Sequence, residues 1–155
     1  MKIFALNKRA NYDYNILETF EAGLVLKGHE VKSIKNGHIS LQGAYVIIRN
    51  NEAYLLNAAV SPYQQKNTPK DYDPTKTKKL LLHRKEIKYL IGKSKERGLT
   101  LVPIKVYTKE GKTSQGRGKL KLEFGIGRGK KKVDKRELIK KQEAKREIER
   151  KLKSS

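Results

Sequence analysis

Alternating apolar and polar positions predict two long β-strands in this chain of 155 residues. From Tyr14 to Leu26 the even-numbered positions are nearly all apolar, while the odd-numbered positions are mostly polar and include Glu21. The same alternation returns from Lys119 to Ile126. Because successive side chains of a strand point to opposite faces, each segment would bury one face and expose the other. Glu21 is therefore expected on an outward face.

Three shorter segments add further strands. Ile39–Arg49 and Glu52–Val60 are rich in apolar residues and are joined through Asn50-Asn51. Asparagine tolerates positive φ, so this junction predicts a hairpin. Leu99–Thr108 has the composition of another strand. The chain thus contains about five strands, mostly antiparallel.

A helical spacing interrupts the strands at His29–Asn36, where Val31 and Ile34 lie three positions apart. Gly37 can end such a helix in the left-handed conformation. The alternative is a two-residue hairpin turn at Asn36-Gly37. We favour the helix, because its apolar spacing fits one helical face.

Two more segments favour helix. Asp73-Pro74 combines a capping acid with a proline suited to the first helical turn, and it follows the polar loop Ser61–Asp73. Arg84–Arg97 carries apolar residues on one helical face and stops before Gly98. Taken together, residues 1–127 are expected to form a mainly β domain, an OB-type antiparallel β-barrel with two or three short helices.

Residues 128–155 form a basic C-terminal tail of a different kind. This segment holds 13 Lys or Arg and 5 acidic residues, with few apolar side chains. Its burial cannot offset the entropy of ordering the chain, so we expect it to be disordered when free. From Asp134 onward the residues nevertheless favour helix and include no Gly or Pro. A polyanion that neutralises the cations would allow the tail to become helical.

Charge narrows the possible partners. The formal net charge is +21, and residues 1–127 are basic on their own, with 24 Lys or Arg against 11 acidic residues. Such an excess favours RNA or DNA as the partner. No apolar run approaches the roughly 20 residues of a membrane span, and the first residues do not resemble a secretion signal. We therefore expect a cytoplasmic protein with no membrane association.

Catalysis has little support in the sequence. The chain has no cysteine, which excludes thiolate metal sites and cysteine nucleophiles. His29 and His38 could flank a phosphodiester as acid and base, but their spacing matches no familiar catalytic or metal site. We expect no enzymatic activity, no metal and no cofactor.

Binding residues are easier to find, because basic and aromatic side chains alternate. Near the start of the chain they are Lys8, Arg9, Tyr12 and Tyr14, in the polar loop they are Tyr63 and Tyr72, and further on Tyr107 lies beside Lys105 and Lys109. Tyrosine can stack on unpaired bases while neighbouring cations meet phosphate. A second cationic group, at Lys76, Lys78 and Lys79, could contact phosphate or could be a solvated helix face. Glu21 would repel phosphate, so it is expected to accept hydrogen bonds from base or ribose edges.

Several motifs in order resemble the SsrA-binding protein family, also called small protein B. They are Asn7-Lys8-Arg9-Ala10, Glu21-Ala22-Gly23-Leu24, Gly28-His29-Glu30-Val31-Lys32-Ser33, Asp73-Pro74-Thr75-Lys76-Thr77-Lys78-Lys79-Leu80-Leu81-Leu82-His83, Leu101-Val102-Pro103, Gly129-Lys130-Lys131 and Asp134-Lys135-Arg136. Each motif is weak alone, but their common order along almost the whole chain is specific.

The resemblance implies an RNA-binding factor of bacterial ribosome rescue. Its barrel would bind the tRNA-like domain of transfer-messenger RNA and deliver that RNA to stalled ribosomes, in the process called trans-translation. Its tail would enter the empty mRNA channel past the decoding centre of the small subunit, contact ribosomal RNA and fold as a helix there. We expect the chain to act as a monomer.

The resemblance and the charge pattern together nominate two sets of residues. The RNA-binding set comprises Asn7, Lys8, Arg9, Tyr12, Tyr14, Glu21, Val31, Lys32, Lys76, Lys78 and Lys79. The set expected to act in the decoding centre comprises Gly129, Lys130, Lys131, Lys132, Asp134, Lys135, Arg136, Lys140 and Lys141. The competing hypothesis is a structural ribosomal protein whose basic extension permanently threads ribosomal RNA.

Overall fold

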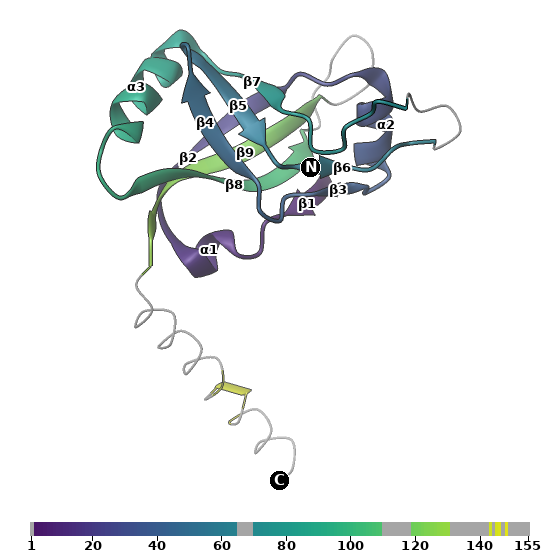
Figure 1. Ribbon diagram of the computed structural model, residues 1–155. Helices are drawn as coiled ribbons and strands as arrows, with labels where there is room; N and C mark the ends of the chain where they lie inside the picture. Colours follow the sequence, from purple (N-terminus) through teal and green to yellow (C-terminus); the bar gives the residue numbers. More distant parts are fainter. Residues whose placement is uncertain are drawn as a thin grey trace.

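Strands dominate the computed structural model, which describes residues 2–64, 70–109 and 119–130 together with Glu143, Lys145, Arg146 and Ile148. The strands of this part are β1 (Lys2–Leu6), β2 (Tyr14–Leu24), β3 (Ile39–Ser40), β4 (Tyr45–Arg49), β5 (Glu52–Leu56), β6 (Ala59–Val60), β7 (Lys78–Leu81), β8 (Leu99–Thr108) and β9 (Leu120–Gly129). The helices are α1 (Ala10–Asp13), α2 (Gly28–Lys35) and α3 (Arg84–Ser94) (Figure 1).

The antiparallel ladders close on themselves. Strand β8 pairs with β4 and β9, and the ring continues through β5, β7 and β2, while β1 adds to the outer edge of β8. The extent of strand pairing differs around the ring. Strands β2 and β9 pair along most of their length, whereas β4 and β8 share the single pair Val46 and Leu101. The mainly β, antiparallel class predicted from the sequence is confirmed, with more strands than the five expected. The OB type remains a prediction.

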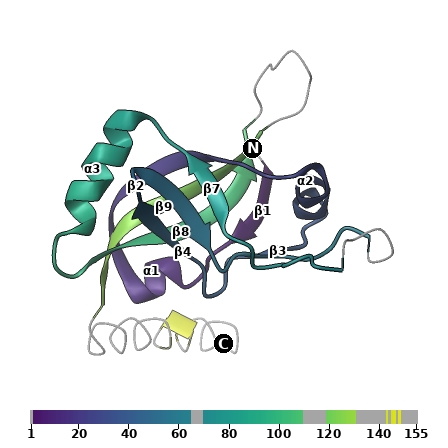
Figure 2. The same ribbon diagram turned by 45° about the horizontal axis from the view of Figure 1, so that its top comes forward.

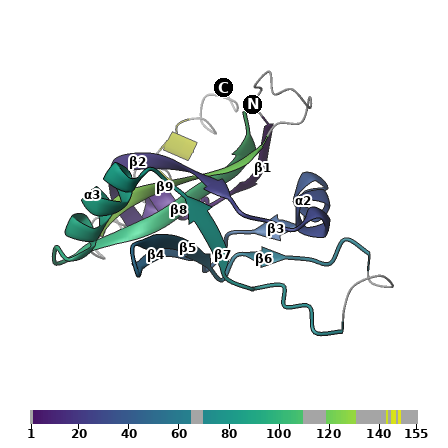
Figure 3. The same cartoon turned by 90° about the horizontal axis from the view of Figure 1, so that it is seen from above.

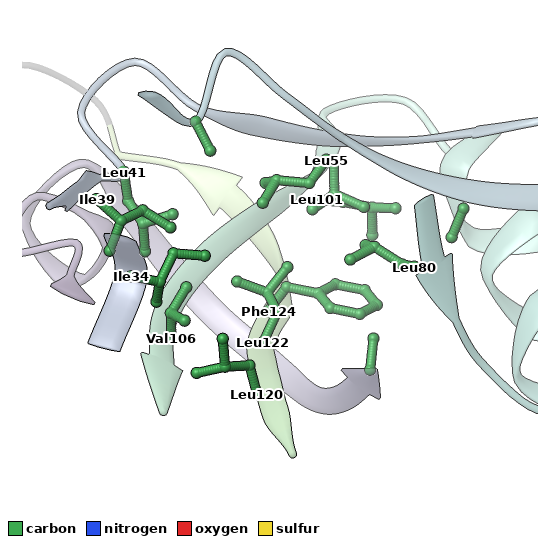
Figure 4. Packing of buried hydrophobic residues seen from close by; sticks show 14 of the residues in the cluster. Ile34, Ile39, Leu41, Leu55, Leu80, Leu101, Val106, Leu120, Leu122 and Phe124 are labelled. Atoms are coloured by element: carbon green, nitrogen blue, oxygen red, sulfur yellow. The ribbon is translucent and has the colours of Figure 1, made fainter. Parts of the chain in front are cut away.

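The core fills the inside of this ring. Leu120, Leu122, Phe124 and Ile126, which the alternation of β9 placed on one face, are all buried. Figure 4 shows Phe124 and Leu122 at the centre of the cluster, with Val106 of β8 and Ile34 of α2 packed nearby. The period-two prediction for β9 is therefore confirmed.

The hairpin β4–β5 turns at Asn50 and Asn51, whose φ values of 52° and 60° confirm the expected positive-φ turn. The two runs flanking it were predicted as single strands, and this was wrong. Gly43 and Asn57, with φ of 75° and 61°, bend both runs at the same level. The outer ends then leave the ring as the small sheet β3–β6, which lies beside α2 (Figure 3).

Of the three predicted helices, two are confirmed and one is wrong. Helix α2 ends at Lys35 and Gly37 follows with φ of 81°, so the helix is correct and the alternative hairpin turn is excluded. Helix α3 corresponds to the segment predicted from Arg84. No helix follows Asp73, whose Oδ1 accepts hydrogen bonds from the Thr75 amide and hydroxyl, both at 2.9 Å. The acid closes a turn here, because the residues that follow alternate into the core as β7.

Two elements at the start of the chain, β1 and α1, have no counterpart in the prediction. Figure 2 shows α3 and α2 at opposite ends of the barrel, with α1 below it and between them in this view. Glu143, Lys145, Arg146 and Ile148 have helical backbone and exposed side chains, and the rest of the tail beyond Lys130 lies outside the described residues.

Candidate nucleic-acid interface

Four of the expected RNA-binding residues gather at one cleft beside α1. Asn7, Lys8, Arg9 and Tyr14 line it together with the segment from Ile39 to Tyr45, and its volume is about 620 Å³. The polypeptide reaches this place because the Asn7 amide donates to the Ile104 carbonyl at 2.7 Å, which ends β1 against β8. The cleft therefore brings together residues that the sequence had linked only by proximity.

Asn7 is held by the barrel itself. Its Nδ2 donates to the Pro103 carbonyl at 2.8 Å, and its Oδ1 accepts from the Arg9 amide at 3.3 Å. These two contacts fix the turn that presents Lys8 and Arg9, whose side chains are exposed. Asn7 thus supports the turn that presents these two cations. Arg9 is paired with Asp13, its Nε lying 3.4 Å from Asp13 Oδ2.

The start of the basic tail is fastened to the same place. The Lys130 amide donates to the Asp13 carbonyl at 2.9 Å, and its Nζ donates to the Asn11 carbonyl at 2.6 Å. Strand β9 accommodates Tyr14 closely, because a Cβ on Gly127 would lie 3.1 Å from the Tyr14 Cβ. Both Gly127 and Gly129 belong to β9, so the barrel strand continues two residues past the expected domain boundary.

Glu21 lies on an outward face, as the alternation of β2 predicted, in a group that we call the outer sheet face: Glu21, Lys105, Tyr107, Lys109, Lys121 and Glu123. Glu21 is paired directly with Glu123 across β2 and β9. Like charges opposite each other destabilise a sheet, and each is matched by a lysine. Lys109 Nζ lies 2.7 Å from Glu21 Oε2, and Lys105 Nζ lies 3.3 Å from Glu123 Oε2.

Tyr107 reaches across this face and donates its hydroxyl to Glu21. The hydrogen bonds from Lys109 and Tyr107 hold the pKa of Glu21 below its usual value of 4.5. Burial and the Glu21 carboxylate raise the pKa of Tyr107 above its usual 10. Glu21 is thus an ionised acceptor with partners in the free protein, and an RNA edge would have to share or replace them. The group offers alternating charge in place of a uniform basic patch.

A second region of the expected RNA-binding residues lies at α2. Lys32 is exposed, whereas Val31 is half-buried and packs against the hydrophobic core. Val31 therefore positions the helix and Lys32 faces outward from it. Strand β2 starts beside α1 and ends shortly before α2, so the two regions lie at opposite ends of the strand that carries Glu21 (Figure 1).

The three lysines near β7 have different environments. Lys76 and Lys79 are exposed, and Lys79 pairs with Glu52 at 3.0 Å. Lys78 is only 3% exposed, and its Nζ donates to the carbonyls of Ala58 and Lys76 at 3.1 and 2.8 Å. Neither the expected phosphate contact nor the solvated helix face fits Lys78, because its strand pairs with β5 so that Lys78 lies inward opposite Leu55.

Lys78 belongs to a polar group that we call the α2 junction: Glu30, Ser33, Ser61, Tyr72 and Lys78. Ser33 donates its hydroxyl to the Ser61 carbonyl, and Tyr72 donates to the Val60 carbonyl at 2.7 Å. Burial lowers the pKa of Lys78, and the charges of Glu30 and Asp73 oppose that shift. These contacts attach α2 and the β3–β6 sheet to the barrel.

The remaining predictions fall partly outside what can be described. Tyr12 is half-buried and Gly129 is exposed at the end of β9. Lys131, Lys132, Asp134, Lys135, Arg136, Lys140 and Lys141 lie outside the described residues. His29 contacts the Tyr72 ring edge-on at 5.4 Å between centroids, and His38 is exposed. In the described part of the chain, no three His, Asp or Glu side chains converge as metal ligands.

The sequence already placed Tyr107 beside Lys105 and Lys109 as candidate binding residues, but it did not connect them with Glu21 or Lys121. Lys105 and Tyr107 lie in β8, Lys109 follows that strand and Lys121 lies in β9. Only the pairing of β8 and β2 with β9 brings these residues close to Glu21. The alternation of the two long strands does predict part of the group, because it places Lys121 and Glu123 on an outward face, like Glu21. Their partners on β8 depended on a register that no local pattern specifies.

A closed antiparallel barrel with exposed cations around clefts and sheet faces is typical of small RNA-binding proteins. The family model described as SmpB protein matches residues 4–154. The chain belongs to the SmpB protein family. None of its described helices is long and apolar enough to cross a lipid bilayer.

Similar proteins agree with this assignment. The chain is 51% identical over 149 residues to the SsrA-binding protein of Geobacillus kaustophilus, covering 96% of this chain and 91% of that protein. It is 49% identical over 154 residues to the SsrA-binding protein of Enterococcus faecalis, covering 99% and 95%. A solved structure described as "tmRNA-SmpB: a journey to the center of the bacterial ribosome" is 42% identical, with a TM-score of 0.63, covering 82% of this chain and 84% of that chain.

Proposed function

We propose that this protein binds the tRNA-like domain of transfer-messenger RNA and delivers it to stalled ribosomes, as a non-enzymatic factor of trans-translation in the cytoplasm. The observation that carries the proposal is the family match along residues 4–154, with relatives named SsrA-binding protein and a similar chain solved with tmRNA and the ribosome. The exposed cations beside α1 and α2 and the outer sheet face support an RNA partner.

The proposal divides the chain between two tasks. Residues 1–127 hold the RNA through Lys8, Arg9, Tyr12, Tyr14, Glu21 and Lys32, with Lys76 and Lys79 as exposed cations near β7. Asn7, Val31 and Lys78 act from within the fold. Residues 128–155 occupy the mRNA channel and the decoding centre, with Gly129 to Lys132, Asp134 to Arg136, Lys140 and Lys141 against ribosomal RNA. The protein acts as a monomer.

The attachment of Lys130 to α1 supports this division. Two hydrogen bonds to the carbonyls of Asn11 and Asp13 fix where the tail leaves the barrel, next to the turn that presents Lys8 and Arg9. A protein that connects one RNA to a second RNA-lined site needs such a fixed departure point, because a freely rotating tail would lose entropy when it entered the channel.

Competitive binding tests the first task. Purified protein is offered the tRNA-like domain and unrelated structured RNAs of equal length at about 150 mM salt, where phosphate affinity common to all RNAs is weakened. We expect a clear preference for the tRNA-like domain. Equal affinity for all the RNAs would contradict the adaptor function and favour the structural ribosomal protein with a basic extension.

Truncation tests the second task. A chain ending at Lys130 keeps the contacts to Asn11 and Asp13 and loses the rest of the tail. We expect nearly unchanged affinity for the tRNA-like domain but loss of peptide tagging in a reconstituted translation system with a stalled ribosome. A large loss of affinity would instead place the tail on the transfer-messenger RNA.

A further inference from the structure

Tyr63 lies beside α2, close to the side chain of Lys32. Lys32 Nζ lies 5.8 Å from the centroid of the Tyr63 ring, within the range of a cation–π contact. Both side chains are exposed, and Tyr63 keeps 38% of its surface accessible. Because the ring and the ammonium are both exposed, a partner can contact them together.

The segment before Tyr63 is fastened to α2. Ser33 of α2 donates its hydroxyl to the Ser61 carbonyl, and the Ser61 amide donates to the His38 carbonyl at 3.1 Å. Pro62 then fixes its own φ next to Tyr63. The ring is therefore placed near Lys32 before any partner arrives, which lowers the entropy that binding must remove.

Tyr72, on the same side of the barrel, provides the contrast. Its hydroxyl donates to the Val60 carbonyl and its ring contacts His29, so its surface supports the α2 junction. Burial raises its pKa above the usual 10. The hydroxyl of Tyr63 has no hydrogen-bond partner among the described residues. Tyr72 is thus a structural tyrosine, while the ring of Tyr63 remains available.

We propose that Tyr63 stacks on an unpaired base of the bound RNA while Lys32 contacts a backbone phosphate next to that base. Aromatic rings accept any base face, and a lysine binds phosphate as a point charge, so the pair recognises a single-stranded stretch. This inference rests on the proposed function, because it assigns a contact within the same RNA complex. It assigns a particular contact to Tyr63, which the pattern of basic and aromatic residues already nominates as a candidate for base stacking.

A single tryptophan tests the stacking directly. The chain has no tryptophan, so Tyr63→Trp introduces one fluorophore at the proposed contact. We expect its emission to be strongly quenched when the in vitro transcript of the tRNA-like domain is added to saturation. Tyr89→Trp is the matched control, because Tyr89 on α3 is 40% exposed and lies at another end of the barrel (Figure 2). Unchanged emission at position 63, or equal quenching at both positions, would overturn the proposal.

Affinity as a function of salt separates the two contacts. Tyr63→Ala should weaken binding by about 5- to 150-fold, the range for loss of one stacked base, without changing the slope of log K against log salt. Tyr63→Phe should keep the affinity. Lys32→Ala should reduce the slope by about one phosphate contact. Equal affinity of Tyr63→Ala and the native protein, with native circular dichroism, would contradict the stacking.

The failures of the two proposals can be told apart. If the native protein shows no preference for the tRNA-like domain, the proposed function fails. If that preference holds but Tyr63→Ala binds normally and tryptophan at position 63 is not quenched, only the stacking fails.

Discussion

Polar side chains serve different purposes at the α2 junction and on the outer sheet face. At the α2 junction, Lys78 is buried and its ammonium is shared between two backbone carbonyls. On the outer sheet face, Glu21 and Lys109 form an ion pair with side chains that are 33% and 61% exposed. Both Lys78 and Glu21 were expected to contact RNA. Only the second lies where RNA can reach it.

The difference concerns the cost of losing a partner. A buried charge left without partners keeps its full desolvation penalty, whereas an exposed charge regains water. The α2 junction is therefore suited to holding elements together, and the outer sheet face is suited to exchanging one partner for another. The same barrel thus places its buried and its exposed charges in separate regions.

The largest effect should come from Lys78→Ala, which tests the α2 junction. It leaves the Ala58 and Lys76 carbonyls without their donor and removes the positive neighbour of the largely buried Glu30. We expect the free energy of unfolding to fall by about 3 kcal/mol, measured by urea denaturation.

Its neighbour provides the control, because Lys79 is exposed and pairs only with Glu52 among the described residues. Lys79→Ala should change the free energy of unfolding by less than about 1 kcal/mol. Similar losses for both lysines would contradict the contrast between a buried and an exposed cation.

An intermediate effect on the free energy of unfolding is expected at Gly125, where the outward face of β9 packs against the apolar side chain of Ile16. A Cβ on Gly125 would lie 2.7 Å from Ile16 Cγ2 and 2.9 Å from the Glu18 carbonyl oxygen. Because backbone cannot move aside cheaply, Gly125→Ala should lower the free energy of unfolding by about 2 kcal/mol, seen as a lower melting temperature.

Gly92→Ala serves as the comparison for this substitution. Gly92 lies in α3 with nothing within 4 Å of its added Cβ, so the change should raise the stability by about 0.5–1 kcal/mol. An unchanged melting temperature for Gly125→Ala would mean that β2 and β9 are less closely packed than the structure shows.

The smallest effect belongs to Glu21 and depends on pH. Its pKa in the folded protein lies below 4.5, so its ionised form adds stability above pH 4.5 that is lost as the pH falls through the folded pKa. Since the pair is partly exposed, the gain is below about 1 kcal/mol. Glu21→Gln should therefore flatten the fall in stability between pH 5 and pH 3, measured by urea denaturation.

Lys109→Ala removes the main partner of Glu21 and should flatten the same fall to a similar extent. If neither variant changes the acid limb of the stability curve, the ion pair on the outer sheet face contributes nothing measurable. Glu21 would then matter only when RNA is bound.

Much of the barrel was predictable where a strand buries one face without interruption. Strand β2 does so only from Glu18 onward, because the register shift between Ile16 and Glu18 turns Tyr14 and Ile16 to the face opposite the predicted one. In β9 the alternation of the sequence is enough to predict that Leu120, Leu122, Phe124 and Ile126 face the core, where they are buried. The turn at Asp73 could not be predicted, because an Asp-Pro pair is equally suited to a helix start and to a turn that precedes a strand. The bend at Gly43 and Asn57 also lacked a local signal, since each residue is compatible with several conformations.

The sequence by itself determined the phase of β9 and of β2 from Glu18 to Leu24, the cationic character of both parts of the chain and the motif order of the family. These depend on side-chain types at fixed spacing, which a linear chain already contains. Only the tertiary structure decided which polar residues are free. Lys78 is buried because β7 pairs with both β5 and β2, whereas Glu21 lies on the outward face of β2 and keeps 33% of its side chain exposed. For these two residues burial is set by the pairing of strands far apart in sequence, which the local pattern does not specify.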